Sequence, residues 1–211
     1  IPVNDHSETI VLDYGGPNIA KPLHIGHLRS AIIGEALKRL FKYNGFTVIG
    51  DVHLGDWGLQ MGLVIAEYQE RHPSWPCFSK NFNSTKDSIP EINVDELNEI
   101  YPYASEKSKT DDEFRNIAKS ITSELQKGNA GYIALWNKIR QASIADLKKI
   151  YQNLSVDFDY WYGESDAQKY IDTLMLVLQE NELIYESDGA LVVNVSDESD
   201  KKNVPPVLIK K

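Results

Sequence analysis

Short apolar runs and helix-like periodicity alternate along the first part of the chain. Residues 9–12 form an apolar run followed by a turn, which predicts a buried strand, and residues 46–49 form a second such run. Between them, apolar side chains recur at helical spacing over 24–43, at Leu28, Ala31, Ile32, Ala36, Leu40 and Phe41. A second helix is expected over 59–70. This order of elements predicts an α/β fold with a doubly wound parallel sheet.

Two turns, 13–27 and 51–60, follow the predicted strands. Ligands of doubly wound sheets bind outside the carboxyl ends of the strands. We therefore expect both turns to line one crevice and the candidate binding residues to lie in them.

The pattern becomes irregular after residue 71. Four prolines and several serine and asparagine residues over 72–105 predict a long insertion without regular structure. Two helices are expected next, over 111–127 and 129–152, with a break at Gly128. The remaining expected elements are a strand over 156–162, a helix over 166–181, a β-hairpin that turns at Gly189, and a strand from residue 205.

The composition places the chain among folded proteins. With 211 residues, 42% of them hydrophobic and 25% charged, it can bury a sizeable core, which excludes global disorder. No apolar run approaches the roughly 20 residues that span a bilayer, and the first residues lack the pattern of a signal peptide. The single cysteine, Cys77, excludes an internal disulfide framework and a multi-cysteine zinc site. We therefore expect a cytoplasmic protein with no membrane contact.

Acidic residues exceed basic ones and gather towards the C-terminus. The chain holds 31 acidic and 22 basic side chains, for a net charge of −9. Residues 157–200 contain 12 acidic residues and one basic residue, Lys169. That segment would repel a polyanion, so we interpret it as a solvated face and expect any nucleic-acid contact elsewhere.

The strongest chemical signal is His24-Ile25-Gly26-His27, where the first turn enters its predicted helix. A helix N-terminus attracts anions through its free N–H groups and its dipole. Gly26 carries no side chain, so an adenine or a ribose can approach the backbone. The two histidines can donate hydrogen bonds to phosphate oxygens while charge shifts in an in-line displacement. Taken alone, the spacing is also compatible with two structural histidines at a helix start.

The segment from Pro17 to His27 resembles the HIGH signature of the class I aminoacyl-tRNA synthetases. The longer block PNIAKPLHIGHLRS, together with HLGDWGLQMG from His53, is similar to the arginyl-tRNA synthetases in particular. The similarity continues through Leu135-Trp136, Phe158-Asp159, Gly163-Glu164-Ser165 and Asp188-Gly189-Ala190. It covers nearly the whole chain, and the two long blocks are more specific than the HIGH tetrapeptide, which related nucleotidyltransferases share.

The resemblance implies a role for each matched position. It assigns ATP binding to Lys21, His24, Gly26 and His27, and catalysis to Lys21, His24 and His27. It assigns arginine binding to Asp13, Gly16, Pro17, Asn18, His27, Asp56 and Gln60, with Asp13 facing the substrate guanidinium. The pair Gly15-Gly16 departs from the family's serine-containing pair, which puts a side-chain contact there in doubt.

Structural interpretations stay open for several of these residues. Asp13 is alternatively a turn cap, Asn18 an ordinary turn asparagine, and Glu164 a helix cap. Trp57 is interpreted as packing, and His53 borders the crevice without an assigned role.

The implied activity is ATP-dependent activation of L-arginine to arginyl-adenylate, followed by transfer to tRNA(Arg). Mg²⁺ would enter with the ATP, and no protein-bound metal is expected. The implied fold is the first half of a Rossmann-like catalytic domain over 1–71, an irregular and helical insertion over 72–162, and a final part over 163–211. That final part would hold a helix, an acidic hairpin insertion and the start of the next core strand.

The family's other parts would lie outside these residues. They include a second phosphate-binding signature and an anticodon-binding domain, through which tRNA would mainly bind. We therefore expect an isolated chain that cannot charge tRNA. The resemblance implies a monomeric full-length enzyme. Two alternatives remain: another HIGH-type nucleotidyltransferase, and a non-catalytic paralogue that keeps the fold.

Overall fold

The computed structural model describes residues 8–197, 199, 200, 202 and 204–210. These residues divide into two compact units, one reaching to Ser165 and one starting at Asp166. The predicted three-part division begins and ends at residues outside the described ones, and it stays a prediction.

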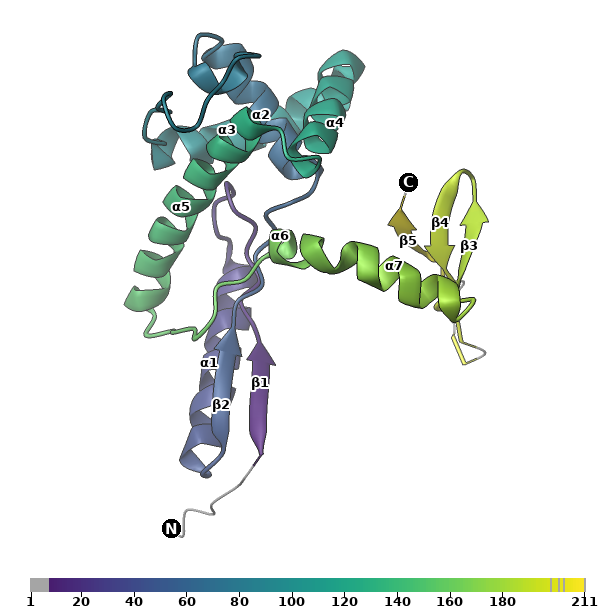
Figure 1. The fold of residues 1–211 in the computed structure, drawn as a ribbon. Coiled ribbons are helices and arrows are strands. Elements are labelled where there is room, and N and C mark those ends of the chain that lie inside the picture. Colours follow the sequence, from purple (N-terminus) through teal and green to yellow (C-terminus); the bar gives the residue numbers. More distant parts are fainter. Residues whose placement is uncertain (1–7, 198, 201, 203, 211) are drawn as a thin grey trace. The chain divides into compact units, whose positions relative to one another are not determined.

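The first unit contains a parallel pair of strands with a helix as the crossover. Strand β1 (Thr9–Asp13) pairs in parallel with β2 (Thr47–Asp51), in a register that runs from Thr9↔Thr47 to Asp13↔Asp51. Helix α1 (Ile25–Tyr43) connects them and packs along one face of the pair (Figure 1). The α/β class and the parallel pairing are confirmed, with two strands in the parallel sheet among the described residues.

The expected burial of the first strand is wrong. Val11, at the centre of β1, is 64% exposed, and the side chains of β1 alternate between exposed and half-buried. The apolar run predicts a strand correctly, but β1 has β2 as its single neighbour within the described residues. Successive side chains of a strand point to opposite faces; Leu12 lies beside residues of α1, so Val11 lies on the face that α1 does not cover.

Helix α1 also buries a different face from the one expected. Its buried residues are Ala31, Gly34, Glu35 and Lys38. By contrast, Ile32 is 50% exposed and Leu40 is 55% exposed, although both belong to the predicted apolar face. The helix itself begins and ends close to the predicted bounds, because His24 caps one end and Asn44 the other.

Polar contacts explain this inverted packing. The ring of Tyr14 lies so close to α1 that a Cβ at position 34 would be 2.1 Å from it, so a glycine is required there. The Tyr14 hydroxyl lies 2.9 Å from Glu35 Oε2. Lys38 Nζ donates to the carbonyl of Asp157 at 2.7 Å. The inner face of α1 thus makes polar contacts with Tyr14 and with the segment after α5. These contacts explain which residues of the helix are buried.

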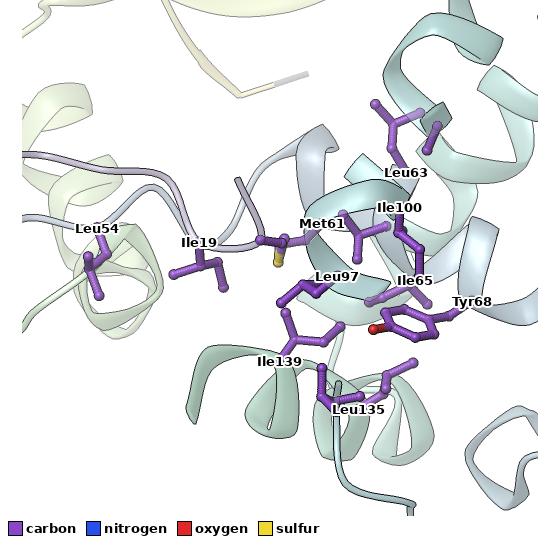
Figure 2. Close-up of a cluster of buried hydrophobic side chains, with 14 of the residues drawn as sticks. Ile19, Leu54, Met61, Leu63, Ile65, Tyr68, Leu97, Ile100, Leu135 and Ile139 are labelled. Carbon is purple, nitrogen blue, oxygen red and sulfur yellow. The ribbon is translucent and has the colours of Figure 1, made fainter. Parts of the chain in front are cut away.

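The hydrophobic core lies around α2 (Leu59–Arg71), whose residues 61–68 are all buried. Three helices surround it: α3 (Val94–Thr110), α4 (Asp112–Gln126) and α5 (Ala130–Asn153). Figure 2 shows Ile65, Tyr68, Leu97, Ile100, Leu135 and Ile139 meeting in this core, with Ile19 and Leu54 entering from the two turns. The turns of the α/β part are therefore anchored in the helical core.

Two expectations for the insertion are wrong. Helix α3 begins at Val94, inside the segment expected to be irregular, with Asn93 as its N-cap. It accommodates Pro102, the residue that argued against a helix. Residues 156–162 form no strand; they follow 50–54 through isolated bridges, Asp51↔Tyr160 and Leu54↔Gly163.

Cys77 lies in a short 3₁₀ turn, η1 (Pro76–Phe78), against α5. A Cβ at Gly131 would be 1.9 Å from the carbonyl oxygen of Cys77, so the turn and the helix are in direct backbone contact. Cys77 is 2% exposed, and burial raises the pKa of its thiol to about 11. A buried and protonated thiol in this environment has a packing role.

The second unit holds a broken helix and an antiparallel sheet. The helix expected over 166–181 is divided into α6 (Glu164–Ala167), which starts before the unit boundary, η2 (Gln168–Tyr170) and α7 (Ile171–Glu180). Strands β3 (Ile184–Ser187) and β4 (Ala190–Val193) form the expected hairpin. Strand β5 (Val207–Lys210), expected as the start of a core strand, instead pairs antiparallel with β4.

Across the described part of the chain, no helix is long and apolar enough to cross a membrane. The same residues contain no cluster of three or more histidine, cysteine, aspartate or glutamate side chains that could hold a metal ion.

Candidate active site

The two turns at the carboxyl ends of β1 and β2 lie side by side, as expected. Asn18 and Gly55 form a parallel bridge between them. The backbone N–H of Ile19 donates to the carbonyl of Gly55 at 3.1 Å, and the N–H of Gly55 donates to that of Pro17 at 3.1 Å. A Cβ at Gly55 would be 1.9 Å from Asn18 Oδ1, so this close approach requires glycine.

His24 and His27 form a reciprocal cap at the start of α1. Nδ1 of His24 accepts from the N–H of Gly26 at 3.1 Å, and Nδ1 of His27 accepts from the N–H of His24 at 3.3 Å. Their rings stack, with centroids 3.7 Å apart. A Cβ at Gly26 would lie 3.0 Å from the His24 ring, which gives a second reason for a glycine between the histidines.

This cap determines where each histidine holds its proton. Since a backbone N–H points at each Nδ1, that nitrogen is unprotonated and the neutral ring carries its proton on Nε2. Burial lowers the pKa of His27, and the nearby charges of His24 and Lys21 lower it further. Nε2–H donors beside a helix N-terminus suit an anionic ligand.

Two glycines shape the turn before these histidines. Gly15 has φ +91° and Gly16 has φ +38°, both in the left-handed region where residues with a Cβ are strained. A Cβ at Gly15 would also be 3.2 Å from the Phe158 ring. The departure from a serine-containing pair therefore has a backbone reason in this chain.

Two carboxylates stand next to each other at the strand ends. Asp13 and Asp51 are register partners in the parallel pair, and Asp13 is exposed. Burial raises the pKa of Asp51, and the charge of Asp13 raises it further. One oxygen of Asp51 has no hydrogen-bond partner among the described residues. A cationic group beside Asp13 would relieve this repulsion.

Asp56 is fully buried, and its carboxylate is engaged internally. Arg140 Nε donates to Oδ2 at 2.9 Å, while the N–H and the hydroxyl of Ser165 donate to the two oxygens at 2.8 Å each. A Cβ at Gly163 would be 2.5 Å from the same carboxylate. Asp56 therefore links the second turn to α5 and to residues 163–165, and the arginine contact that the resemblance implies for it stays a prediction.

Gln60 is likewise turned inward. Its amide donates to the carbonyl of Ile19, so it holds the first turn instead of facing the crevice. Lys21 follows that turn, with Nζ 5.8 Å from the centre of the Tyr101 ring. A cavity of about 300 Å³ lies beside it, lined in part by Asn18, Lys21 and Asp146. Asn18 and Lys21 thus line one cavity beside the first turn, and the charge of Lys21 acts on His27.

The sequence also singles out Pro17, Gly16, His53, Trp57 and Glu164. Pro17 is buried beneath the turn, whereas Gly16 and His53 are exposed. Trp57 packs edge-to-face on Trp136, with ring centres 5.1 Å apart, as its interpretation as a packing residue predicted. Glu164 is exposed, and its backbone N–H donates to the carbonyl of Leu54 at 3.0 Å.

Sequence reasoning missed Arg140, Ser143 and Ser165, which hold the turns from behind. Ser143 accepts the N–H of Ala20 at 3.1 Å. Arg140 and Ser143 lie on α5, more than 80 residues away from the turns that they contact. Ser165 lies in the noted Gly163-Glu164-Ser165 segment, which was the available signal.

Comparison with known proteins extends this picture. Residues 2–211 match the family model described as the catalytic domain of class I (R) tRNA synthetases. The chain is 52% identical over 204 residues to an arginine–tRNA ligase of Alkaliphilus oremlandii, and 51% identical over 203 residues to one of Agathobacter rectalis. These alignments cover 97% and 96% of this chain but 35% and 34% of the relatives. The chain thus spans about a third of the length of the curated relatives it matches.

Solved structures agree with this match. The structure of arginyl-tRNA synthetase from Plasmodium falciparum superposes with a TM-score of 0.73, at 26% identity, over 97% of this chain and 32% of that one. That of Thermus thermophilus gives a TM-score of 0.63 at 19% identity, over 98% of this chain and 33% of that one, which supports the fold alone. With its paired turns, its histidine cap and these similarities, the chain belongs to the class I (R) tRNA synthetase catalytic-domain family.

Proposed function

We propose that the full-length protein containing this chain is an arginine–tRNA ligase, and that this chain supplies the first half of its catalytic domain. The observation that carries the proposal is the reciprocal cap of His24 and His27 at the start of α1, which follows the paired strand-end turns. The family match and the identity to arginine–tRNA ligases support it. Its substrates would be L-arginine, ATP and tRNA(Arg), and its place of action the cytoplasm.

The amino acid would lie across the first turn. The carboxylate of Asp13 pairs with the guanidinium, and Asn18 holds the polar end, while Gly16 and Pro17 line the turn with backbone and His27 closes the side towards α1. The raised pKa of Asp51 supports a cation here, because a bound guanidinium would stabilise both charged carboxylates.

The nucleotide would lie over the start of α1. In the first step, the arginine carboxylate attacks the α-phosphate of ATP in line, which forms arginyl-adenylate and releases pyrophosphate. The Nε2–H groups of His24 and His27 donate to the phosphate oxygens as charge builds up, and Lys21 adds a positive charge nearby. Gly26 leaves room for the nucleoside. Mg²⁺ entering with the ATP would neutralise charge on the polyphosphate.

Asp56 and Gln60 have supporting roles in this proposal. Their side chains bond to Arg140, Ser165 and the carbonyl of Ile19, so they keep the turns in place. The second step, transfer to the terminal adenosine of tRNA, would involve regions outside this chain, and so would most tRNA contacts. The full-length protein is proposed to act as a monomer.

ATP–pyrophosphate exchange by the full-length protein tests the proposal. It is measured with arginine and with lysine, each in the presence and absence of tRNA. We expect exchange with arginine and not with lysine, since a bidentate guanidinium contact discriminates between them. Exchange with another amino acid would indicate a different HIGH-type enzyme, and no exchange under any condition would indicate a non-catalytic paralogue. The isolated chain is expected to charge no tRNA.

A further inference from the structure

A single peptide group in the first turn is held from two sides. The carbonyl of Ile19 and the N–H of Ala20 belong to the same planar unit. Gln60 on α2 donates to that carbonyl, and Ser143 on α5 accepts from that N–H at 3.1 Å. Two bonds on opposite edges of one plane define its orientation.

The residue after this peptide has a strained backbone. Ala20 has φ +59°, in the left-handed region that a residue with a Cβ rarely adopts. Such a conformation persists where the surroundings impose it. Here Ile19 is 0% exposed and Ala20 is 3% exposed, and Figure 2 shows the side chain of Ile19 pointing towards Met61 of α2. The core and the two hydrogen bonds together oppose relaxation of Ala20.

The left-handed residue sets the direction of the segment that leads into α1. Lys21 comes directly after Ala20, and Pro22 then restricts the backbone further. His24 caps α1 three residues beyond Lys21. If Ala20 relaxed to negative φ, the chain would leave the core at a different angle, and Lys21 would move relative to the two histidines.

We propose that Gln60 and Ser143 form a clamp on the Ile19–Ala20 peptide, which keeps Ala20 left-handed and holds Lys21 beside the phosphate-binding end of α1. Both are positioning residues and touch no substrate. The function of Lys21 in this statement rests on the proposed arginine–tRNA ligase activity, whereas the clamp itself rests on the observed hydrogen bonds. The clamp explains why Gln60 faces inward and why a serine lies buried on α5, where it is 7% exposed.

The first test measures the clamp without reference to activity. Hydrogen–deuterium exchange is followed in the full-length protein for peptides that cover 17–23. Ser143→Ala removes the acceptor of the Ala20 N–H, so exchange in this segment is expected to rise about tenfold. Ser120→Ala, at an exposed serine of α4, is the matched control and leaves it unchanged. Unchanged exchange in Ser143→Ala would overturn the clamp.

The second test separates positioning from general support. In ATP–pyrophosphate exchange, Ser143→Ala is expected to lower kcat about tenfold with little change in the KM for arginine. Ala20→Gly adopts positive φ without strain, so the double variant Ala20→Gly/Ser143→Ala is expected to regain most of the lost kcat. A loss that the glycine does not rescue would contradict control through the Ala20 backbone.

Gln60→Glu provides an independent variant if Ser143→Ala folds poorly. The carboxylate keeps the size of the side chain but cannot donate to the carbonyl of Ile19, so the same rise in deuterium exchange is expected. An inactive wild-type protein whose deuterium exchange responds as expected would refute the proposed ligase activity and retain the clamp. An active wild-type protein with unresponsive variants would refute the clamp and retain the ligase.

Discussion

Helices α1 and α2 follow the two strands of the same parallel pair, and they bury opposite kinds of side chain. Helix α2 is enclosed by α3, α4 and α5, and its residues 61–68 are buried without a break. Helix α1 turns Glu35 and Lys38 inward, and it exposes most of its large apolar side chains. An apolar periodicity therefore locates a helix in the sequence. It does not indicate whether this chain contains the partner for the apolar face of that helix.

The exposed side of α1, here called the outer surface, is apolar. It consists of Ile25, Ile32, Ile33, Leu37, Leu40 and Tyr43, each 42% to 80% exposed. A large exposed apolar patch usually marks a contact surface. Because the chain spans about a third of its relatives' length, we expect the rest of the full-length protein to cover it.

The largest expected difference between α1 and α2 is at a matched pair of isoleucines. Ile65→Ala in α2 creates a cavity at a residue that is 0% exposed, and it is expected to lower the free energy of unfolding by about 2–5 kcal/mol. Ile33→Ala in α1, at a residue 55% exposed, is expected to change it by about 0.5 kcal/mol or less. Urea unfolding of the 211-residue chain measures both. Equal losses would show that the two helices do not differ as described.

The inner face of α1 offers the next largest effect. Lys38→Met keeps most of the side-chain volume but removes the donor to the Asp157 carbonyl and the charge that pairs with Asp159 at 3.3 Å. The free energy of unfolding is expected to fall by about 1–3 kcal/mol, because buried polar groups lose their partner. Lys42→Met, at an exposed position on the same helix, is the control. A stable Lys38→Met protein would mean that polar contacts do not hold α1.

Whether the outer surface is covered in the full-length protein can be tested by measuring the same substitution in the chain and in the full-length protein. Ile33→Ala is expected to have little effect in the chain but to cost about 1 kcal/mol in the full-length protein, where the surface would be covered. Thermal unfolding of both forms measures the difference. The expectation of a covering segment fails if the substitution is equally neutral in both.

The smallest expected effect is a loss of folding stability at acidic pH. Burial raises the pKa of Glu35, but hydrogen bonds from Arg39, the Asp157 N–H and Tyr14, together with the charge of Lys38, bring it below its usual value. A carboxyl whose pKa is lower in the folded state stabilises the fold above its unfolded pKa, and this stability is lost as the pH falls through the folded pKa. Unfolding measured from about pH 6 to pH 3 should therefore show a decline that is shallower in Glu35→Gln.

Some of that decline should remain in Glu35→Gln. A hydrogen bond from the Gly50 N–H lowers the pKa of Asp159, and the charge of Lys38 contributes to the shift. Identical profiles for the wild-type protein and the variant would place the pH dependence elsewhere in the chain.

Local signals in the sequence predicted much of this fold. The bounds of α1 follow from a cap and a stop that lie next to the helix, and the parallel pairing follows from the order of the elements. The buried face of α1 was not predictable in this way, because Glu35 and Lys38 find their partners at Tyr14 and Asp157. Helix α3 was missed because Pro102 argues against a helix interior.

The same distinction between local signals and distant contacts applies to the candidate site. The position of the two histidines at the start of α1 could be predicted, because His24, Gly26 and His27 lie within one turn of helix, whereas their mutual cap was not predicted. The inward roles of Asp56 and Gln60 could not, since they depend on Arg140, Ser165 and Ile19, which the fold brings close. Residues that bind ligands and residues that hold those residues in place look alike in a sequence.

The buried cysteine gives this chain a built-in reporter. Cys77 is the single thiol of the chain, it lies against α5, and its pKa of about 11 keeps it protonated at neutral pH. A thiol-reactive dye can label it only when η1 separates from α5. The labelling rate of the unaltered 211-residue chain therefore measures how often the helical layer behind both turns opens, with no probe introduced.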